Sequence, residues 1–413
     1  MRASDNYRVY ASFCSSSAPA AASATVSNWL ESYNPTDNSW RPAGTVPGLP
    51  QDHVLKDFAM ITLGGSIFII GGRLCRKVYS TLHCSVVDMD VAVVPTVIRH
   101  DVSTGQWCAC SPLATPRFNF AAAACAGGIY VAGGLCGLSG GARGTSSAEV
   151  YDPVADRWAP LPNMSARRYK CVGVAWLPGK VHVIGGFAEP QEEDEEEVEG
   201  NCSGGSHRKG GSLLRAALER SSAEVFDVLR GEWELAPGMW QLDVPPNEIV
   251  SMGGRLYSSG DCLNNWKGHI EVYDGKLGIW NILEGSHLDD LSSLSPSVLD
   301  GARGSSVGEQ EEVEEEEEEA VATGGAVQRL YLTMAPVGTQ LYCVAGYRVA
   351  PPTEASSSSL QATVVHTFDM ATASVESTTT RRNTGGSWRS FEPVMEQSGT
   401  KELCGRCCVV QVA

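Results

Sequence analysis

The side chains best suited to chemistry in this chain are its fourteen cysteines and eight histidines. Cys404, Cys407 and Cys408 include a Cys-x-x-Cys pair, which is a common half of a zinc site. A structural zinc site needs four ligands, and these three residues lie in a segment that we expect to form a strand. The sequence therefore predicts that the three thiols are buried and hold no metal.

No catalytic motif accompanies these residues. The sequence contains neither a Gly-x-Ser-x-Gly nucleophile motif nor a phosphate-binding loop. Its histidines are spread singly, and we expect His53, His100 and His182 to have ordinary packing roles. The sequence thus predicts a protein that is not an enzyme and that holds no cofactor and no metal.

The charge of the chain is concentrated in two acidic tracts. Residues 189–199 carry eight acidic side chains and residues 309–319 carry nine, and the other 31 acidic residues balance the 31 Lys and Arg. Because nucleic-acid binding needs a surplus of basic side chains on one face, no nucleic-acid partner is predicted. The chain has no run of 18 apolar residues and no signal-peptide stretch, which predicts no membrane partner, reduced thiols and a cytoplasmic or nuclear location.

A compound pattern recurs along the chain and defines the elements that must position any site. An aromatic residue or His is followed by Asp or Asn, and Trp stands seven positions after the first residue. The copies are Tyr33 with Trp40, His100 with Trp107, Tyr151 with Trp158, Phe226 with Trp233 and Tyr273 with Trp280. A hairpin with a tight turn between residues 154 and 155 places Tyr151 opposite Trp158, and such a pair contributes about 0.5 to 1 kcal/mol beyond its buried area.

A second hairpin is expected upstream of each Trp hairpin, where an apolar run surrounds a glycine turn. These runs span residues 58–72, 120–134, 171–186, 249–261 and 330–347. Their nearly continuous apolar character predicts strands that are covered on both faces. Each unit would then be four antiparallel strands. The intervals between successive Trp residues are 67, 51, 75 and 47, which indicates a unit of roughly 50 residues with insertions.

A repeat of this length, with Gly-Gly and a downstream Trp, resembles the kelch motif, and the resemblance covers nearly the whole chain. It implies an all-β fold in which residues 1–413 form one six-bladed kelch β-propeller. The sixth unit, residues 330–347 with 363–369, departs from the pattern because Val375 stands seven positions after Phe368. Trp388 is the candidate substitute, reached through a longer connection.

The two ends of the chain are expected to share one blade. Residues 7–13 look like a second strand, with the third and fourth strands ending at Trp40, and residues 405–413 look like the missing first strand. Closing the ring with N- and C-terminal strands resembles the usual kelch arrangement and leaves no exposed sheet edge. Since Met1 stands a few residues before the first strand, we expect no F-box or BTB module ahead of the propeller.

Long segments are expected on one face of the propeller, because each follows a second or a fourth strand. They are residues 73–94, 135–146, 187–220 and 281–327. We call this face the insertion-bearing face. Elaborated loops often mark the binding side of a repeat protein, and neutral drift in tolerant surface loops is the alternative. The last two segments contain the acidic tracts, whose dense like charge predicts disordered insertions.

Basic residues stand before the first strands on this face, near the expected central channel. The candidate partner-binding residues are Lys56, Arg117, Arg167, Arg168, Asn247 and Arg406. A basic ring could bind an acidic peptide, with the acidic tracts as internal competitors. The alternative is that these residues brace neighbouring blades.

Four cysteines lie near the ends of second strands on the same face. Cys14, Cys75, Cys136 and Cys262 could form a thiol cluster that senses electrophiles or holds metal. The alternative is that they are small buried hydrophobic residues, as we expect for most cysteines here.

The function that these observations favour is a non-catalytic protein–protein interaction module, with a protein or peptide partner on the insertion-bearing face. The resemblance to F-box/kelch and BTB/kelch proteins implies target recognition in a ubiquitin-ligase-like or regulatory complex, with ubiquitin-ligase components as partners. Two alternatives stay open. One is a kelch-like metal-dependent oxidase, which would need a copper site of two Tyr and two His; the other is a general scaffold.

Overall fold

The computed structural model describes residues 7–16, 27–80, 85–139, 143–190, 220–240, 244–260, 269–283, 327–349, 360–370, 387–395 and 401–412. The regular structure in these ranges is almost entirely β-strand, arranged in small antiparallel sheets. None of the described residues belongs to a helix long and apolar enough to span a membrane. The chain is therefore all-β, as the sequence predicts.

Six sheets of four or five strands account for most of the described residues. Sheet 1 contains β1 (Tyr7–Ser15), β2 (Trp29–Asn34), β3 (Ser39–Thr45), β30 (Lys401–Leu403) and β31 (Cys408–Gln411). Sheet 2 contains β5 (Ala59–Leu63), β6 (Ser66–Ile70), β9 (Val97–Asp101) and β10 (Gln106–Cys110). Sheet 3 contains β11 (Ala121–Cys125), β12 (Gly128–Ala132), β13 (Ala148–Asp152) and β14 (Arg157–Leu161).

The other three large sheets repeat this plan. Sheet 4 contains β16 (Val172–Ala175), β17 (Lys180–Ile184), β19 (Ala223–Asp227) and β20 (Glu232–Ala236). Sheet 5 contains β21 (Ile249–Met252), β22 (Arg255–Ser258), β23 (Glu271–Asp274) and β24 (Ile279–Ile282). Sheet 6 contains β25 (Val327–Val337), β26 (Gln340–Val349), β27 (Leu360–Asp369), β28 (Ser387–Ser390) and β29 (Val394–Met395).

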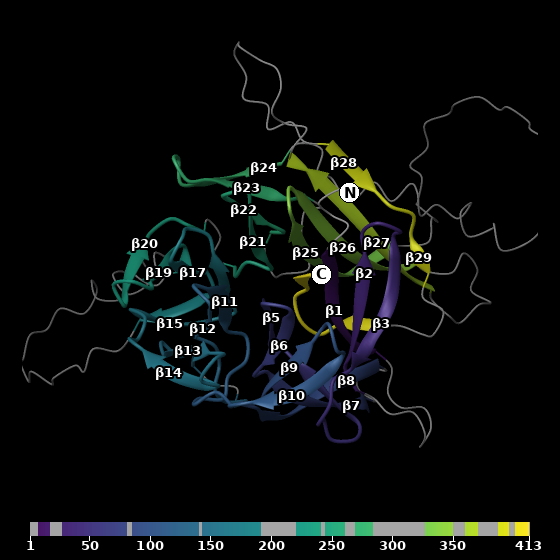
Figure 1. Cartoon of the computed structure of the whole chain (residues 1–413), viewed down its shortest axis with the longest axis horizontal. Helices are drawn as coiled ribbons and strands as arrows, with labels where there is room; N and C mark the ends of the chain where they lie inside the picture. The colour runs from purple at the N-terminus through teal and green to yellow at the C-terminus, as the bar shows by residue number, and fades with distance from the viewer. Residues whose placement is uncertain are drawn as a thin grey trace, which may run out of the picture.

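The sheets follow one another in chain order around a common centre (Figure 1). Their innermost strands touch in sequence, from β5 to β11, β16, β21 and β25. β31 contacts both β25 and β5, and it pairs with β1, so that Val9 lies opposite Val409. The two ends of the chain therefore share sheet 1. Neighbouring sheets cover both faces of the inner strands, which explains their continuous apolar sequence.

Each of the five Trp hairpins has the expected register. Tyr151 lies opposite Trp158, and their ring centroids are 5.1 Å apart. The equivalent residues are paired in sheets 1, 2, 4 and 5. In sheet 6 Phe368 lies opposite Trp388, also with 5.1 Å between centroids. Trp388 thus completes the sixth hairpin across a longer connection.

The Gly-Gly pairs end the second strands because the chain passes very close to its neighbour there. Gly133 has a φ of 71°, in the region that favours glycine. A Cβ atom on Gly133 would lie 2.6 Å from the carbonyl oxygen of Arg168, which is too close for any other residue. Glycine is therefore required where sheet 3 meets the start of sheet 4.

Two smaller sheets form where segments before a first strand pair with segments after a second strand. β4 (His53–Lys56) pairs with β7 (Arg73–Ser80), which pairs with β8 (Ser85–Val93). β15 (Ala166–Tyr169) pairs with β18 (Phe187–Pro190). The expected long segment 73–94 is thus mainly a β-hairpin. The disordered insertions predicted at 187–220 and 281–327 lie mostly outside the described residues, as does the acidic tract at 309–319.

Candidate functional site

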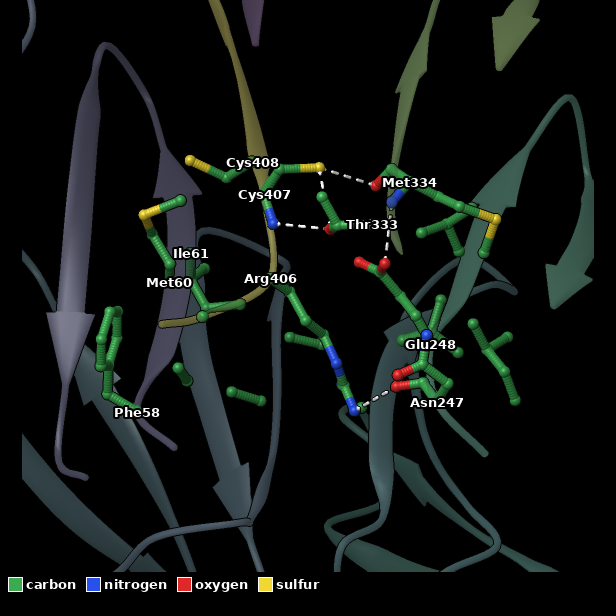
Figure 2. Close-up of a pocket in the computed structure, with 18 of the residues that line it drawn as sticks. Phe58, Met60, Ile61, Asn247, Glu248, Thr333, Met334, Arg406, Cys407 and Cys408 are labelled. Atoms are coloured by element: carbon green, nitrogen blue, oxygen red, sulfur yellow. Dashed lines mark hydrogen bonds between the residues drawn. The ribbon is translucent and has the colours of Figure 1, made fainter. Parts of the chain in front are cut away.

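A cavity of about 580 Å³ opens where the inner strands meet. Each large sheet contributes one stretch to its wall; these stretches fall within residues 57–62, 119–124, 170–175, 246–251, 332–336 and 403–409. Much of the wall is made of small or aliphatic side chains, among which a few polar groups stand out (Figure 2). A concave, mostly apolar wall with few polar groups is the usual form of a binding site.

Arg406 and Lys170 are the basic residues among those that line this cavity. Arg406 lies in the link between β30 and β31 and is half-buried. Its guanidinium extends toward β21, where Nη2 donates a hydrogen bond to the carbonyl oxygen of Asn247 at 3.1 Å (Figure 2). Lys170 is exposed, and its Nζ lies 5.9 Å from the centre of the Phe187 ring. Both side chains can therefore offer positive charge at the cavity.

Glu248 is the buried acidic group of the cavity wall. One carboxylate oxygen accepts a hydrogen bond from the backbone N–H of Met334 at 2.8 Å (Figure 2). Burial raises the pKa of Glu248 to about 7, although Arg406 acts in the opposite direction. Cys407 lies beside it, and its thiol donates to the carbonyl oxygen of Met334 at 3.1 Å. Glu248 therefore ties sheet 5 to sheet 6 and changes protonation near neutral pH.

Polar residues recur at one position, two residues before the inner strand, in five of the six large sheets. Asp57, Asn119 and Lys170 hold this position before β5, β11 and β16, with φ values of 54°, 53° and 55°. The backbone N–H of Asn119 donates to the oxygen of Asp57 at 3.1 Å, and that of Lys170 donates to the oxygen of Asn119 at 2.7 Å. Asn247 and Arg406 hold the same position before β21 and β31. We call these five residues the mouth residues.

Among the residues predicted to bind a partner, only Asn247 and Arg406 line the cavity. Arg117 and Arg168 are fully buried. Arg117 Nη2 lies 2.7 Å from a carboxylate oxygen of Glu149, and Arg168 Nε lies 3.2 Å from one of Glu224. The guanidinium groups thus act inside single units, those of sheets 3 and 4, and not between neighbouring blades.

Lys56 and Arg167 lie away from the cavity wall as well. Lys56 is buried, with its ammonium group 3.2 Å from Asp88 and 2.6 Å from Glu402. Arg167 is half-buried in β15, where its backbone pairs with Glu189. The ammonium group of Lys56 is thus neutralised inside the fold.

Sequence reasoning missed Asp57, Asn119, Lys170 and Glu248. The first three lie within three residues of the arginines and lysine that the sequence analysis chose. Their shared position directly before an apolar run is the sequence signal that marks them. Positive charge, which marks Lys56, Arg117 and Arg168, does not identify this position. Asp57 is ion-paired with Arg73, so its charge is offset at the mouth.

The four cysteines proposed as a cluster do not share one environment. Cys14 and Cys75 are fully buried and Cys136 is exposed, whereas Cys262 lies outside the described residues. Cys404, Cys407 and Cys408 are buried, as predicted. Across the described part of the chain, no group of three or more His, Cys, Asp or Glu could hold a metal ion.

Part of the chain is similar to known proteins. The family model of the Kelch motif matches residues 116–165, a stretch that contains the whole of sheet 3. This segment is similar to a kelch motif. It is 36% identical to the F-box/kelch-repeat protein At1g16250 of Arabidopsis thaliana over 170 residues, which are 39% of this chain and 40% of that protein.

A second kelch relative is aligned over more of the chain. Kelch-like protein 23 of Homo sapiens is 26% identical over 281 residues, which are 61% of this chain and 45% of that protein. The chain therefore spans less than half the length of either relative. Similarity to these proteins supports a protein-interaction module.

Proposed function

We propose that the chain is a six-bladed kelch β-propeller, closed in sheet 1 by its N- and C-terminal strands, and that it binds a protein or peptide partner at the mouth residues. Support for closure comes from β31, which pairs with β1 and touches the inner strands on both sides. Support for the binding surface comes from the cavity, to which every sheet contributes. The module is non-catalytic in this proposal.

The charge at the mouth favours a partner that presents acidic side chains. Lys56, Arg117 and Arg168 are neutralised inside the fold, whereas Lys170 is exposed and Arg406 is half-buried at the cavity. Positive charge beside an apolar hollow steers an acidic peptide and holds it in one orientation. The acidic tracts of the chain itself would then compete with that partner.

The biological setting of the proposal comes from the relatives. The names of several include F-box together with kelch repeat. By analogy, the chain recognises targets for a ubiquitin-ligase-like or regulatory complex in the cytoplasm or nucleus. The proposed setting depends on the analogy with these relatives, whereas the proposed binding surface depends on the mouth residues.

Affinity capture from a cell extract, followed by mass spectrometry, tests the binding surface. We expect the combined change Lys170→Glu and Arg406→Gln to reduce the captured partners at least about tenfold, since it removes both cationic groups of the mouth. The matched control is Arg157→Glu with Arg230→Gln, which alters exposed arginines away from the mouth. Equal capture by the mouth variant and the control would refute the proposal, provided both unfold at the wild-type temperature.

A further inference from the structure

We propose that Cys14 and Cys404 form a reversible disulfide bond that fastens the N-terminal strand to the C-terminal segment. Cys14 lies in β1, and Cys404 directly follows β30. The proposal depends on the placement of these thiols and on the charged groups around them. It does not depend on partner binding.

The register of β1 and β30 places both thiols on one face of sheet 1. Phe13 lies opposite Leu403 and Cys14 lies opposite Glu402. The backbone N–H of Cys404 donates to the oxygen of Ser12 at 2.9 Å, so Cys14 and Cys404 are diagonal neighbours. Diagonal side chains share a face. Both thiols also donate to Glu402, Cys14 to a carboxylate oxygen at 3.8 Å and Cys404 to the carbonyl oxygen at 3.5 Å. The two side chains therefore lie on one face beside the same residue.

A disulfide requires Cβ atoms about 3.5 to 4.5 Å apart, which is closer than diagonal neighbours usually lie. Cys404 stands at the end of β30, in the short link to β31 that also contains Gly405. A link between two short strands can shift more easily than the middle of a long strand. We therefore expect this link to move toward β1 when the disulfide forms.

Two buried lysines, Lys56 and Lys77, lie beside Cys14, and each is ion-paired with both Asp88 and Glu402. The ammonium groups of Lys56 and Lys77 lie 2.6 and 2.9 Å from the carboxylate of Glu402, whose side chain is 40% exposed. The neighbouring Cys404 thiol, followed by the charges of the two lysines, lowers the pKa of Cys14, although burial and the Glu402 carboxylate act in the opposite direction. A lowered pKa favours the thiolate, which is the attacking form of cysteine.

Other buried thiols lack this environment. Burial raises the pKa of Cys171 to about 11 and that of Cys408 to about 12. Burial also raises the pKa of Cys404. Cys14 is therefore the thiol that reacts first, and Cys404 is the thiol that closes the bond.

Hydrogen peroxide can serve as the oxidant that forms the disulfide in two steps. The Cys14 thiolate attacks one peroxide oxygen, the O–O bond breaks, and hydroxide leaves, which produces a sulfenic acid. The Cys404 sulfur then gives up its proton and attacks the sulfenic sulfur; the S–O bond breaks, and the hydroxide leaves as water with that proton. The two sulfurs lose two electrons in total, and a small dithiol restores them by thiol–disulfide exchange.

Peptide mapping of the oxidised full-length protein tests the bond. Folded wild-type protein is treated with hydrogen peroxide, its free thiols are alkylated, and the digest is analysed by mass spectrometry. We expect a peptide pair joined through Cys14 and Cys404, two hydrogens lighter than the separate peptides and absent after dithiothreitol. Because the bond closes nearly the whole chain into a loop, the unfolding temperature should rise by about 5 °C.

Matched serine variants separate this bond from other oxidation. Cys14→Ser and Cys404→Ser should lose both the linked peptide and the rise in unfolding temperature, whereas Cys171→Ser, which alters another buried thiol, should keep both. The proposal is overturned if the folded wild-type protein yields no Cys14–Cys404 peptide, or if Cys14→Ser keeps the rise. Should a serine variant fail to fold, the wild-type map decides alone.

Discussion

Arg117 and Arg168 show how single residues hold one unit of this fold together. Each guanidinium binds a Glu and a Ser of its own sheet, Glu149 with Ser147 in one case and Glu224 with Ser222 in the other. Each also donates to a glycine carbonyl at the end of the second strand. The phrase Ser-Ser-Ala-Glu-Val, at 146–150 and 221–225, thus supplies the partners of a buried arginine.

We expect Arg117→Ala to lower the free energy of unfolding by about 3 to 5 kcal/mol, because it leaves the Glu149 carboxylate buried without its partner. Arg157→Ala is the matched control, since Arg157 is exposed in the same sheet, and it should change stability by less than about 0.5 kcal/mol. Urea unfolding of both variants measures the difference. Similar small losses would mean that the ion pair does not hold the sheet.

We expect the free energy of unfolding to depend on pH through the carboxyl group of Glu248. Its pKa is about 7 in the folded protein against an ordinary value of 4.5, so the folded state favours the neutral group. Its contribution to stability is therefore complete below about pH 4.5 and is lost as the pH rises to 7, a change of about 3 kcal/mol. Above pH 7 the loss is constant.

Glu248→Gln isolates this effect, because the amide oxygen can still accept the hydrogen bond from Met334. The difference in unfolding free energy between wild type and variant should shift by about 3 kcal/mol between pH 4.5 and 8, with the wild type becoming the less stable of the two as the pH rises. Urea unfolding at several pH values measures it. A difference that stays constant with pH would show that the carboxyl is not held neutral.

At the scale of the element, the tryptophan of the outer hairpin makes two kinds of contact in sheets 3, 4 and 5. The ring packs on the aromatic residue opposite, as in Tyr151 and Trp158. The indole N–H donates to a carbonyl just after the outermost strand of the preceding sheet: Trp158 to Ser111, Trp233 to Pro162 and Trp280 to Met239, at 2.9, 2.8 and 2.8 Å. One residue thus stabilises a hairpin and joins it to the preceding unit.

Sheet 6 offers a test of the irregular hairpin. A double-mutant cycle with Phe368→Ala and Trp388→Ala should give a coupling energy of about 0.5 to 1.5 kcal/mol, similar to the cycle for Tyr151 and Trp158. Urea unfolding of the single and double variants provides the four stabilities. A coupling near zero in sheet 6 alone would show that the longer connection fails to hold Trp388 against Phe368.

At the scale of the whole molecule, sheet 1 joins residues from both ends of the chain. β31 supplies buried side chains such as Cys408 and Val410 between β5 and β25. Without β31, β1 would keep β2 and β30 but lose the partner of residues Tyr7–Tyr10, and both adjacent inner strands would lose a packing partner. The apolar surface so exposed is continuous with the core.

Removal of residues 405–413 should therefore abolish the single cooperative thermal transition of the described fold, because it exposes the inner faces of sheets 2 and 6. Removal of residues 309–319, which the sequence predicts to be a solvated acidic tract, is the matched control and should leave the transition unchanged. Circular dichroism during heating measures both. An unchanged transition after the first deletion would contradict the role given to β31.

Local sequence is enough to predict the strands of the large sheets and the register of their Trp hairpins. The seven-residue spacing from Tyr151 to Trp158 specifies a hairpin, since the two residues must face each other across a short turn. The apolar runs specified inner strands covered on both faces. These features depend on residues close together in the chain, which is why pattern alone predicts them.

Which charged side chains are buried and which reach the cavity depends on contacts between distant segments. Arg117 and Asn119 are two positions apart in sequence, yet one guanidinium is buried on Glu149 and the other side chain reaches the cavity. Likewise, Cys14 and Cys404 become diagonal neighbours across 390 positions of the chain. Burial and pairing of a charge depend on groups from distant segments of the chain. Local sequence therefore does not predict them.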